Sequence, residues 1–421
     1  MKKIVLMCAL AITQLTLAQN VTTIAGSGSI GHYNANGVLA LFNGPHDIAV
    51  NAAGEIFVAD QVNHRIRKID VNGDVTDFAG GTIGFADGTG AAAQFNNPSG
   101  LCINSAGDLF VADYSNHRIR KITPAGVVTT VAGNGTVGGN DANGTNASFN
   151  GPVGICINSM GVLYVAEQAG HRVRVILNNG DVFTVAGNGM PGYADGQGPM
   201  ATFSSPYDIE VDNANNLYVV DQLNYRIRKI SPTGEVTTFA GDGAQAVVEG
   251  NGTNASFYTP WGITYDPASG NLYVVSAGDV IQQITPSAEV TTFAGFANSG
   301  QFADGTLSSA RFKDPTGIAM GINGDIIVAD YYNHRVRRVG GTASLHEDAT
   351  QLVTVFPNPA ADIITISTES EIHKVHLFNT MGQLVQTEDT PTFSVSALHR
   401  GIYLLSISTD KGIIQCKFVK E

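Results

Sequence analysis

Positive charge is scarce in this chain of 421 residues. It has 23 Lys and Arg against 36 Asp and Glu, which gives a formal net charge of -13. A protein surface that binds the phosphate backbone of a nucleic acid needs the opposite balance. We therefore expect no nucleic-acid partner.

Cysteine is also rare. The four cysteines are Cys8, Cys102, Cys156 and Cys416. Cys8 falls within a leader (below), so the mature chain keeps three, and an odd number argues against a disulfide framework in an exported protein. Cys102 and Cys156 occupy the same position in neighbouring copies of a repeat. They could face each other on adjacent strands, but two buried free thiols are the favoured interpretation.

The chain lacks an apolar run long enough for a membrane span. The mostly apolar stretch from Ile4 to Leu17 follows Lys2-Lys3 and ends in Thr16-Leu17-Ala18. This pattern is typical of a signal peptide with its cleavage site, and it is too short to cross a bilayer. We predict a signal peptide at residues 1–18, no transmembrane segment and an exported mature protein.

A repeat of 53 to 55 residues dominates the rest of the sequence. In six places a Phe is followed three residues later by a Pro, and these prolines are Pro45, Pro98, Pro152, Pro206, Pro260 and Pro315. Self-similarity at such a period indicates a propeller, a solenoid or another repeat architecture.

Each copy contains four short segments that read as strands. In the first copy these are residues 47–51, 55–60, 64–69 and 75–79, with Gly54 and Asn72-Gly73 at turns. Alternating polar and apolar residues between such turns predict antiparallel hairpins. Six four-stranded units around an axis predict an all-β, six-bladed β-propeller, a fold that protects sheet edges.

The ends of the repeat region predict how the ring closes. Residues 21–26, Val-Thr-Thr-Ile-Ala-Gly, match the fourth strand of other copies, such as residues 128–133, and the sixth copy stops after its third strand at Val339. We therefore expect the N-terminal strand to complete the last blade.

The repeat resembles the NHL repeat over residues 21–339. The resemblance rests on Asn63-His64-Arg65, Asn116-His117-Arg118 and Asn333-His334-Arg335, each preceded by an acid that ends a strand. The fifth copy departs from it, with Ser276 in place of the acid and no His-Arg pair. We expect the acid to contact Arg or turn amides, and the histidines to be spread around the ring, too far apart to bind one metal ion.

An acid or amide also stands eight residues before each repeat Phe. Asx-type turn closure explains this better than calcium binding. The residues are Asn34, Asp87, Asp141, Asp195, Glu249 and Asp304.

The composition changes after residue 340, and short alternating segments predict a second, smaller domain, a β-sandwich. This region resembles the type A C-terminal sorting domain of the type IX (Por) secretion system. The matching residues include Pro357, Asn358, Pro359, Asp362, Gly382, Gly401, Tyr403 and Lys417. The predicted domains are the signal peptide (1–18), the propeller (19–340), a linker (341–349) and the sorting domain (350–421).

The resemblance to the sorting domain implies a route and a partner. The chain would enter the periplasm, be recognised by the type IX secretion machinery and cross the outer membrane as a folded cargo. It would then be either attached to the cell surface or released, and the sequence does not decide between these two outcomes.

Residues that follow the repeat prolines are the candidate binding site, because they are expected at the mouth of the central channel. Blades one and four, opposite each other, place Asp47 and Asp208 there, and His32 could approach from a long loop. Such a cluster could hold a divalent cation, or bind a sugar or peptide; the alternative is a solvated rim without a ligand. The predicted site residues are His46, Asp47, Tyr207, Asp208 and Trp261.

No nucleophile elbow, Walker loop or His-Glu-x-x-His motif is present in the sequence. The favoured function is therefore a secreted or surface-displayed binding module for a glycan, peptide or protein, expected to be a monomer. The alternative is a metal-dependent enzyme similar to lactonases or the peptidyl-hydroxyglycine lyase. No catalytic residue and no cofactor is assigned, and a divalent cation at the channel mouth stays an open alternative.

Overall fold

The computed structural model describes residues 19–340, 354–368, 371–379, 384–409 and 412–421, with the backbone alone for 354, 384, 404, 406, 408, 409 and 412–417. The predicted signal peptide and linker lie outside the described residues. The chain divides into two compact units, Met1–Gly341 and Thr342–Glu421. Each unit is described by itself.

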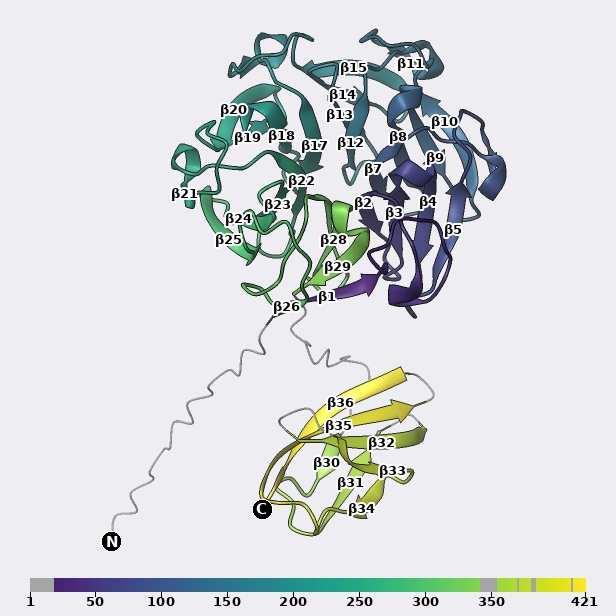
Figure 1. Ribbon diagram of the computed structural model, residues 1–421, viewed down its shortest axis with the longest axis vertical. Coiled ribbons are helices and arrows are strands. Elements are labelled where there is room, and N and C mark those ends of the chain that lie inside the picture. Colours follow the sequence, from purple (N-terminus) through teal and green to yellow (C-terminus); the bar gives the residue numbers. More distant parts are fainter. Residues whose placement is uncertain (1–18, 341–353, 369–370, 380–383, 410–411) are drawn as a thin grey trace. The chain divides into compact units, whose positions relative to one another are not determined.

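The first unit is a six-bladed β-propeller, as predicted (Figure 1). The innermost strand of each blade begins at the repeat proline, whose missing N–H suits the start of a strand. These strands are β2 (Pro45–Val50), β7 (Pro98–Ile103), β12 (Pro152–Ile157), β17 (Pro206–Val211), β22 (Pro260–Tyr265) and β27 (Pro315–Met320).

The second strand of each blade is apolar and almost fully buried, because blades cover both of its faces. Each of these strands ends at the position where the repeat has an acid, or Ser276 in the fifth blade. These strands are β3 (Ile56–Asp60), β8 (Leu109–Asp113), β13 (Leu163–Glu167), β18 (Leu217–Asp221), β23 (Leu272–Ser276) and β28 (Ile326–Asp330).

A 3-10 turn with a left-handed residue at its end leads to the third strand in most blades. These turns include η2 (Gln61–Asn63), η4 (Tyr114–Asn116), η7 (Gln222–Asn224) and η9 (Tyr331–Asn333). The third strands are β4 (Arg65–Ile69), β9 (Arg118–Ile122), β14 (Arg172–Ile176), β19 (Arg226–Ile230), β24 (Val280–Ile284) and β29 (Arg335–Val339).

The fourth strand lies at the outer edge of each blade. In blades one to five it follows directly in the sequence, as β5 (Val75–Gly80), β10 (Val127–Ala132), β15 (Asp181–Ala186), β20 (Glu235–Ala240) and β25 (Glu289–Gly295). In blade six it is β1 (Asn20–Ala25), which pairs antiparallel with β29. This pairing confirms the predicted closure of the ring.

The loops between blades add a feature that the sequence pattern did not predict. Each loop precedes the first strand of a blade and folds back over the fourth strand of that same blade. In blades two to six it contributes a two-residue fifth strand, and in most cases it also contains a 3-10 turn. The short strands are β6 (Gly88–Thr89), β11 (Ala142–Asn143), β16 (Gly196–Gln197), β21 (Gly250–Asn251) and β26 (Gly305–Thr306). The turns are η1 (Gly37–Leu39), η3 (Gly90–Ala92), η5 (Gly144–Asn146), η6 (Gly198–Met200) and η8 (Gly252–Asn254).

The hydrophobic core lies between blades. Phe95, for example, is fully buried among Ala49 and Phe57 of blade one and Leu101 and Val111 of blade two. Every repeat Phe is fully buried in the same way. Because each blade buries apolar surface against two neighbours, closure of the ring stabilises all six.

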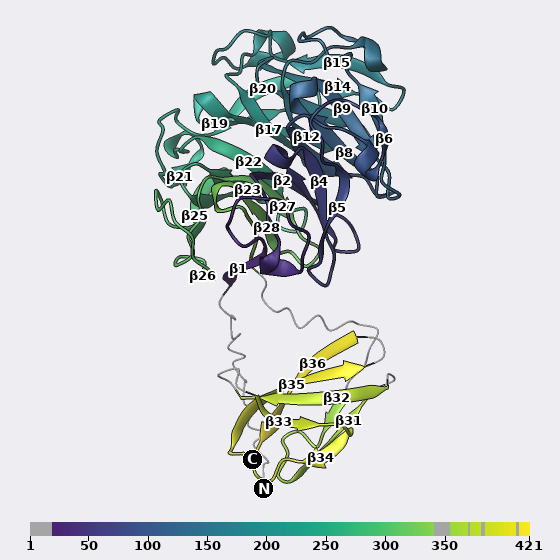
Figure 2. The same ribbon diagram turned by 45° about the vertical axis from the view of Figure 1, so that its right-hand side comes forward.

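The second unit is a small β-sandwich, as predicted (Figure 2). One sheet contains β30 (Thr354–Phe356), β31 (Ile363–Ser367) and β34 (Thr392–Ser394), and the other β33 (Leu384–Glu388), β32 (Ile372–Phe378), β35 (Gly401–Thr409) and β36 (Gly412–Lys420). Its own core includes Ile364, Leu377, Phe393 and Phe418.

Candidate functional site

The turn after the second strand is held by a buried ion pair. In blade two, Arg120 Nη1 donates to Asp113 Oδ2 at 2.8 Å, and both side chains are fully buried. Asp113 also accepts hydrogen bonds from the backbone N–H of Asn96 and the amide of Asn116. The equivalent pairs are Asp60–Arg67, Glu167–Arg174, Asp221–Arg228 and Asp330–Arg337. The predicted contact of the acid with Arg and amides is thus present in five blades.

The turn histidines bind the neighbouring blade. The Nδ1 atom of His117 accepts the backbone N–H of Gly151 at 3.2 Å, and His64, His171 and His334 accept equivalent N–H groups. In blade five Asp279 replaces the histidine and accepts the N–H of Asp314 at 3.0 Å. These histidines are structural and sit in separate blades, as predicted.

The acid before each repeat Phe does not close an Asx turn, so that prediction was wrong. Asp87 pairs with Arg120 at 2.7 Å and accepts hydrogen bonds from the backbone and hydroxyl of Thr130. Asp141, Asp195 and Asp304 make the same contacts in their blades. The acid joins the interblade loop to the third and fourth strands, a long-range role that local sequence spacing does not reveal.

The five predicted site residues separate into two groups. His46, Tyr207 and Trp261 form an aromatic lid that closes one end of the channel. His46 Nε2 and the Tyr207 hydroxyl are 2.6 Å apart, and the rings of Tyr207 and Trp261 meet edge to face at 4.6 Å. His46 is only 6 % exposed and Tyr207 9 %, so these two residues do not form the solvated rim that was the alternative to a binding site.

The aromatic lid leaves almost no space. A void of about 10 Å³ lies beside His46, Tyr207, Asp208 and Trp261. This is about the volume that one water molecule requires. The indole N–H of Trp261 is buried and has no hydrogen-bond partner among the described residues. Burial lowers the pKa of His46 to about 4, so its imidazole is neutral at physiological pH.

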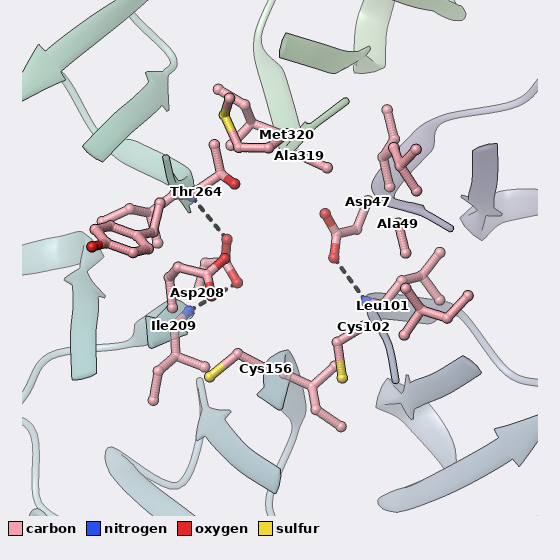
Figure 3. A pocket seen from close by; sticks show the side chains of 18 of the residues that line it. Asp47, Ala49, Leu101, Cys102, Cys156, Asp208, Ile209, Thr264, Ala319 and Met320 are labelled. Atoms are coloured by element: carbon pink, nitrogen blue, oxygen red, sulfur yellow. Dashed lines mark hydrogen bonds between the residues drawn. The ribbon is translucent and has the colours of Figure 1, made fainter. Parts of the chain in front are cut away.

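Asp47 and Asp208 point into the channel, where they lie on opposite sides of the opening (Figure 3). The channel cavity has a volume of about 230 Å³ and also contains Glu210, Thr264 and Cys156 in its wall. Asp47 accepts the N–H of Leu101 at 2.7 Å. Asp208 accepts the N–H of Ile263 at 2.9 Å.

These carboxyl groups are strongly perturbed. Burial raises the pKa of Asp208 to about 7 and that of Glu210 to about 8. Burial and the nearby charge of Asp208 raise the pKa of Asp47 well above its usual range. Desolvation penalises the charged form, and like charges add to the effect. The channel therefore favours either protonated carboxyls or an incoming cation.

The thiols and the remaining candidates lie as follows. Cys102 and Cys156 are free and buried in the channel wall, in line with the favoured interpretation, while Cys8 and the side chain of Cys416 lie outside the described residues.

His32 does not approach the mouth. Its Nε2 binds Asp77 at 2.9 Å and also contacts Arg65 at the outer edge of blade one. In the part of the chain that the structure describes, no three His, Cys, Asp or Glu side chains are grouped to hold a metal ion.

Sequence reasoning missed a ring of amides and phenols around the aromatic lid. The residue directly after each strand-ending acid forms this turn ring, which consists of Gln61, Tyr114, Gln168, Gln222, Ala277 and Tyr331. Tyr114 donates to Gln168 at 3.0 Å, and Tyr331 donates to Gln61 at 3.3 Å. Comparing this one position across the six copies would have found the ring.

The sorting-domain residues lie on the ends and strands of the β-sandwich. The side-chain oxygen of Asn358, which follows Pro357 and precedes Pro359, accepts the N–H of Val419 at 2.9 Å. Asp362 lies just before β31, where its carbonyl accepts the N–H of Val395. Gly401 begins β35, and the Tyr403 hydroxyl donates to the carbonyl of His399 at 3.0 Å. Gly382 and the side chain of Lys417 lie outside the described residues.

Two protein families match this chain. The NHL repeat matches residues 42–69, 95–122, 149–176 and 312–339. The secretion system C-terminal sorting domain matches residues 354–421. The sorting domain indicates export by the type IX system to the cell surface or the extracellular space. The described residues include no helix long and apolar enough to span a membrane.

Curated relatives support the same assignment. NHL repeat-containing protein 2 of Bos taurus is 28% identical over 353 residues, which are 74% of this chain and 48% of that protein. The chloroplastic protein SUPPRESSOR OF QUENCHING 1 of Arabidopsis thaliana is 29% identical over 62% of this chain and 26% of its own length. The chain spans about half the length or less of the curated relatives it matches.

Solved structures show the fold. A protein of unknown function from Bacteroides thetaiotaomicron has a TM-score of 0.62 and 20% identity, covering 77% of this chain and 76% of that one. An auxiliary nutrient binding protein of the same organism has a TM-score of 0.58 and 18% identity, with 76% of each chain covered. A streptogramin B lyase reaches a TM-score of 0.50 at 16% identity, covering 76% of this chain and 98% of its own. At these identities the likeness concerns the fold alone.

Proposed function

We propose that this exported NHL-repeat propeller is a binding module that recognises a neutral, hydroxyl-rich ligand, such as an oligosaccharide, at the turn ring. The observation that carries the proposal is the ring itself. It places amide and phenol groups from successive blades around the aromatic lid on the face where the second and third strands are joined.

The turn ring has the chemistry that hydroxyl groups require. Amides donate and accept hydrogen bonds, and a phenol adds a donor or acceptor on a rigid aromatic body. Gln61, Gln168 and Tyr331 are half-buried, so they are held in place and still reach solvent. Tyr332 extends this surface, since it is 54% exposed and its ring lies 5.0 Å from that of Tyr331.

The charge of the ring favours a neutral ligand. None of its six positions holds Asp, Glu, Lys or Arg. Arg118 and Arg335, which follow two of the turns, donate to carbonyl groups of those turns. The six ring positions offer no countercharge to an acidic or basic peptide, and the nearby Lys313 lies over the ring of Tyr332, so a glycan fits the ring better than a charged peptide.

A metal-dependent enzyme is the weaker alternative. Similar propellers include a lyase, but that likeness concerns the fold alone. The aromatic lid closes the mouth, and the part of the chain that the structure describes presents no grouping of metal ligands. An active site in the channel would also have to admit a substrate into a cavity of about 230 Å³.

Glycan binding by the mature protein tests the proposal. Oligosaccharides would be screened on an array, and the best ligand titrated by calorimetry against wild type, Tyr331→Ala and Gln168→Ala. Central aromatic residues often dominate binding, so we expect the Tyr331→Ala variant to lose roughly tenfold or more in affinity.

A matched control removes an aromatic away from the ring. Phe85 is 44% exposed and stacks on Arg118, so Phe85→Ala is expected to leave glycan affinity unchanged. Equal loss in Phe85→Ala and Tyr331→Ala, or no glycan bound at all, would refute the site.

A further inference from the structure

Three carboxyl groups in the channel lack a positively charged partner. The titratable groups that line the cavity are Asp47, Cys102, Cys156, Asp208, Glu210 and Tyr265, and no Lys, Arg or His is among the lining residues. The buried acids of the turns differ, because each of them pairs with an arginine. A buried charge without a counterion is costly. Once its carboxyls are deprotonated, the channel is suited to receive positive charge from outside the chain.

Backbone N–H groups hold the carboxylates in position but do not use all of their hydrogen-bond acceptor capacity. Asp47 Oδ2 accepts the N–H of Leu101, and Glu210 Oε1 accepts the N–H of Val211 at 2.9 Å. Asp47 also accepts the N–H of Ile48, and Asp208 accepts one N–H on each oxygen, whereas the second oxygen of Glu210 accepts no hydrogen bond from a described residue. A carboxylate can accept several hydrogen bonds, so acceptor capacity remains for a ligand.

Thr264 provides an independent observation. It is only 4% exposed, and its hydroxyl has no hydrogen-bond partner among the described residues. Figure 3 shows this side chain turned toward the opening, beside Asp208. The unpartnered hydroxyl opens onto the cavity, where it can donate to or accept from a polar ligand or water.

Beyond the carboxyls, the wall of the cavity includes apolar side chains. Val50, Ile103, Ile157, Tyr265 and Met320 end the inner strands of their blades and line the cavity beyond the carboxyls. The volume of about 230 Å³ lies below that of a drug-sized site. A small ligand with one charged end and a hydrocarbon body matches this wall.

We propose that the channel binds a primary ammonium group on an aliphatic chain. The ammonium donates its three N–H groups to carboxylate oxygens of Asp208 and Glu210 and to the hydroxyl of Thr264. Asp47 adds negative charge from across the opening, and the methylene groups lie along the apolar strand ends. A bare metal ion fits less well, because the described side chains do not converge as metal ligands. A free alkylamine and a lysine side chain share this chemistry. The site is separate from the turn ring and independent of the proposed glycan binding.

The affinity should depend on pH. Asp208 has a pKa raised to about 7 by burial, and Glu210 one raised to about 8. These groups become charged as the pH rises through those values, whereas an alkylammonium keeps its proton to about pH 10. Binding displaces protons from the carboxyls, so affinity rises from pH 6.0 to pH 8.5.

Calorimetry with the mature protein tests the site. The probes are butylamine, the α-N-acetylated amide of lysine and, separately, calcium chloride. We expect an amine to bind at pH 8.5 with release of protons, and to bind roughly tenfold or more weakly at pH 6.0. Stronger binding of the lysine derivative would identify a protein side chain as the source, and stronger binding of butylamine a free amine.

Isosteric variants locate the site. Asp208→Asn and Glu210→Gln keep the side-chain shape and one oxygen that can accept a backbone N–H, and each should weaken amine binding roughly tenfold or more. Thr264→Val should weaken it less, and Glu235→Gln, on an exposed outer strand, should bind like wild type. Circular dichroism confirms that each variant is folded.

Three outcomes would overturn the proposal. They are no amine binding at pH 8.5, calcium binding without amine binding, and unchanged affinity in the Asp208→Asn and Glu210→Gln variants. Glycan binding measured on the same samples distinguishes failure of this site from failure of the turn ring.

Discussion

Buried ion pairs at the turns can be tested one residue at a time. In an Arg120→Met variant, Asp113 stays buried without its partner, and Asp87 loses a contact as well. Breaking a buried pair from one side costs about 3–5 kcal/mol. We expect a loss of that size in the free energy of unfolding, measured by urea denaturation.

The control for this prediction is a partly exposed pair. Lys68 pairs with Glu55 at 2.9 Å, and their side chains are 31% and 28% exposed. Surface pairs contribute about 0–1 kcal/mol, so Lys68→Met should change the unfolding free energy little. Similar losses in both variants would contradict a special role for the buried pair.

At the residue scale, sequence reasoning found contacts within a repeat better than contacts between repeats. It predicted that the strand-ending acid meets arginine or turn amides, because both lie in one hairpin. It did not predict that His117 accepts an N–H from the next blade or that Asp279 substitutes for a histidine in blade five. Those contacts depend on how neighbouring blades are placed.

The predicted site shows a second limit of the same kind. His46 and Asp47 are adjacent in β2, yet their side chains have different surroundings. One joins the aromatic lid and the other lines the channel. The pairing of β2 with β3 is irregular between Pro45 and Ile48, so simple alternation in the sequence does not settle their directions, and the closed lid depends on the sizes of Tyr207 and Trp261 packed together.

At the element scale, the closure of the ring by β1 can be tested directly. β1 buries Val21 and Ala25 and pairs with β29. Deleting residues 20–25 would expose the edge of β29, and an exposed edge pairs with other chains. We expect the truncated protein to unfold at a lower temperature and to form oligomers in size-exclusion chromatography with light scattering.

A matched protein that begins at Gln19 serves as the control and is expected to be monomeric. A monomeric truncated protein with unchanged thermal unfolding would show that β1 does not hold the ring closed. The sequence predicted β1 because it matches fourth strands elsewhere. It did not predict the two-residue strands of the interblade loops (β6, β11, β16, β21 and β26), because a pattern of alternation cannot be recognised in two residues.

At the scale of the whole molecule, the two units have different tasks. The propeller contains the proposed binding sites, and the C-terminal unit matches the sorting domain over residues 354–421. Each unit has its own hydrophobic core, so one can be removed without stripping the core of the other. This independence allows export and binding to be tested separately.

Deleting residues 350–421 should trap the propeller in the periplasm. The signal peptide would still direct the chain across the inner membrane, but the outer membrane machinery would lack the domain it recognises. Cell fractionation and blotting would detect the shortened protein in the periplasmic fraction, with the full chain at the surface or in the medium as the control. Because the propeller keeps its core, the trapped protein should unfold cooperatively and retain any glycan affinity of the full chain. Appearance of the shortened protein outside the cell would refute the sorting role, and loss of its fold would show that the two units depend on each other.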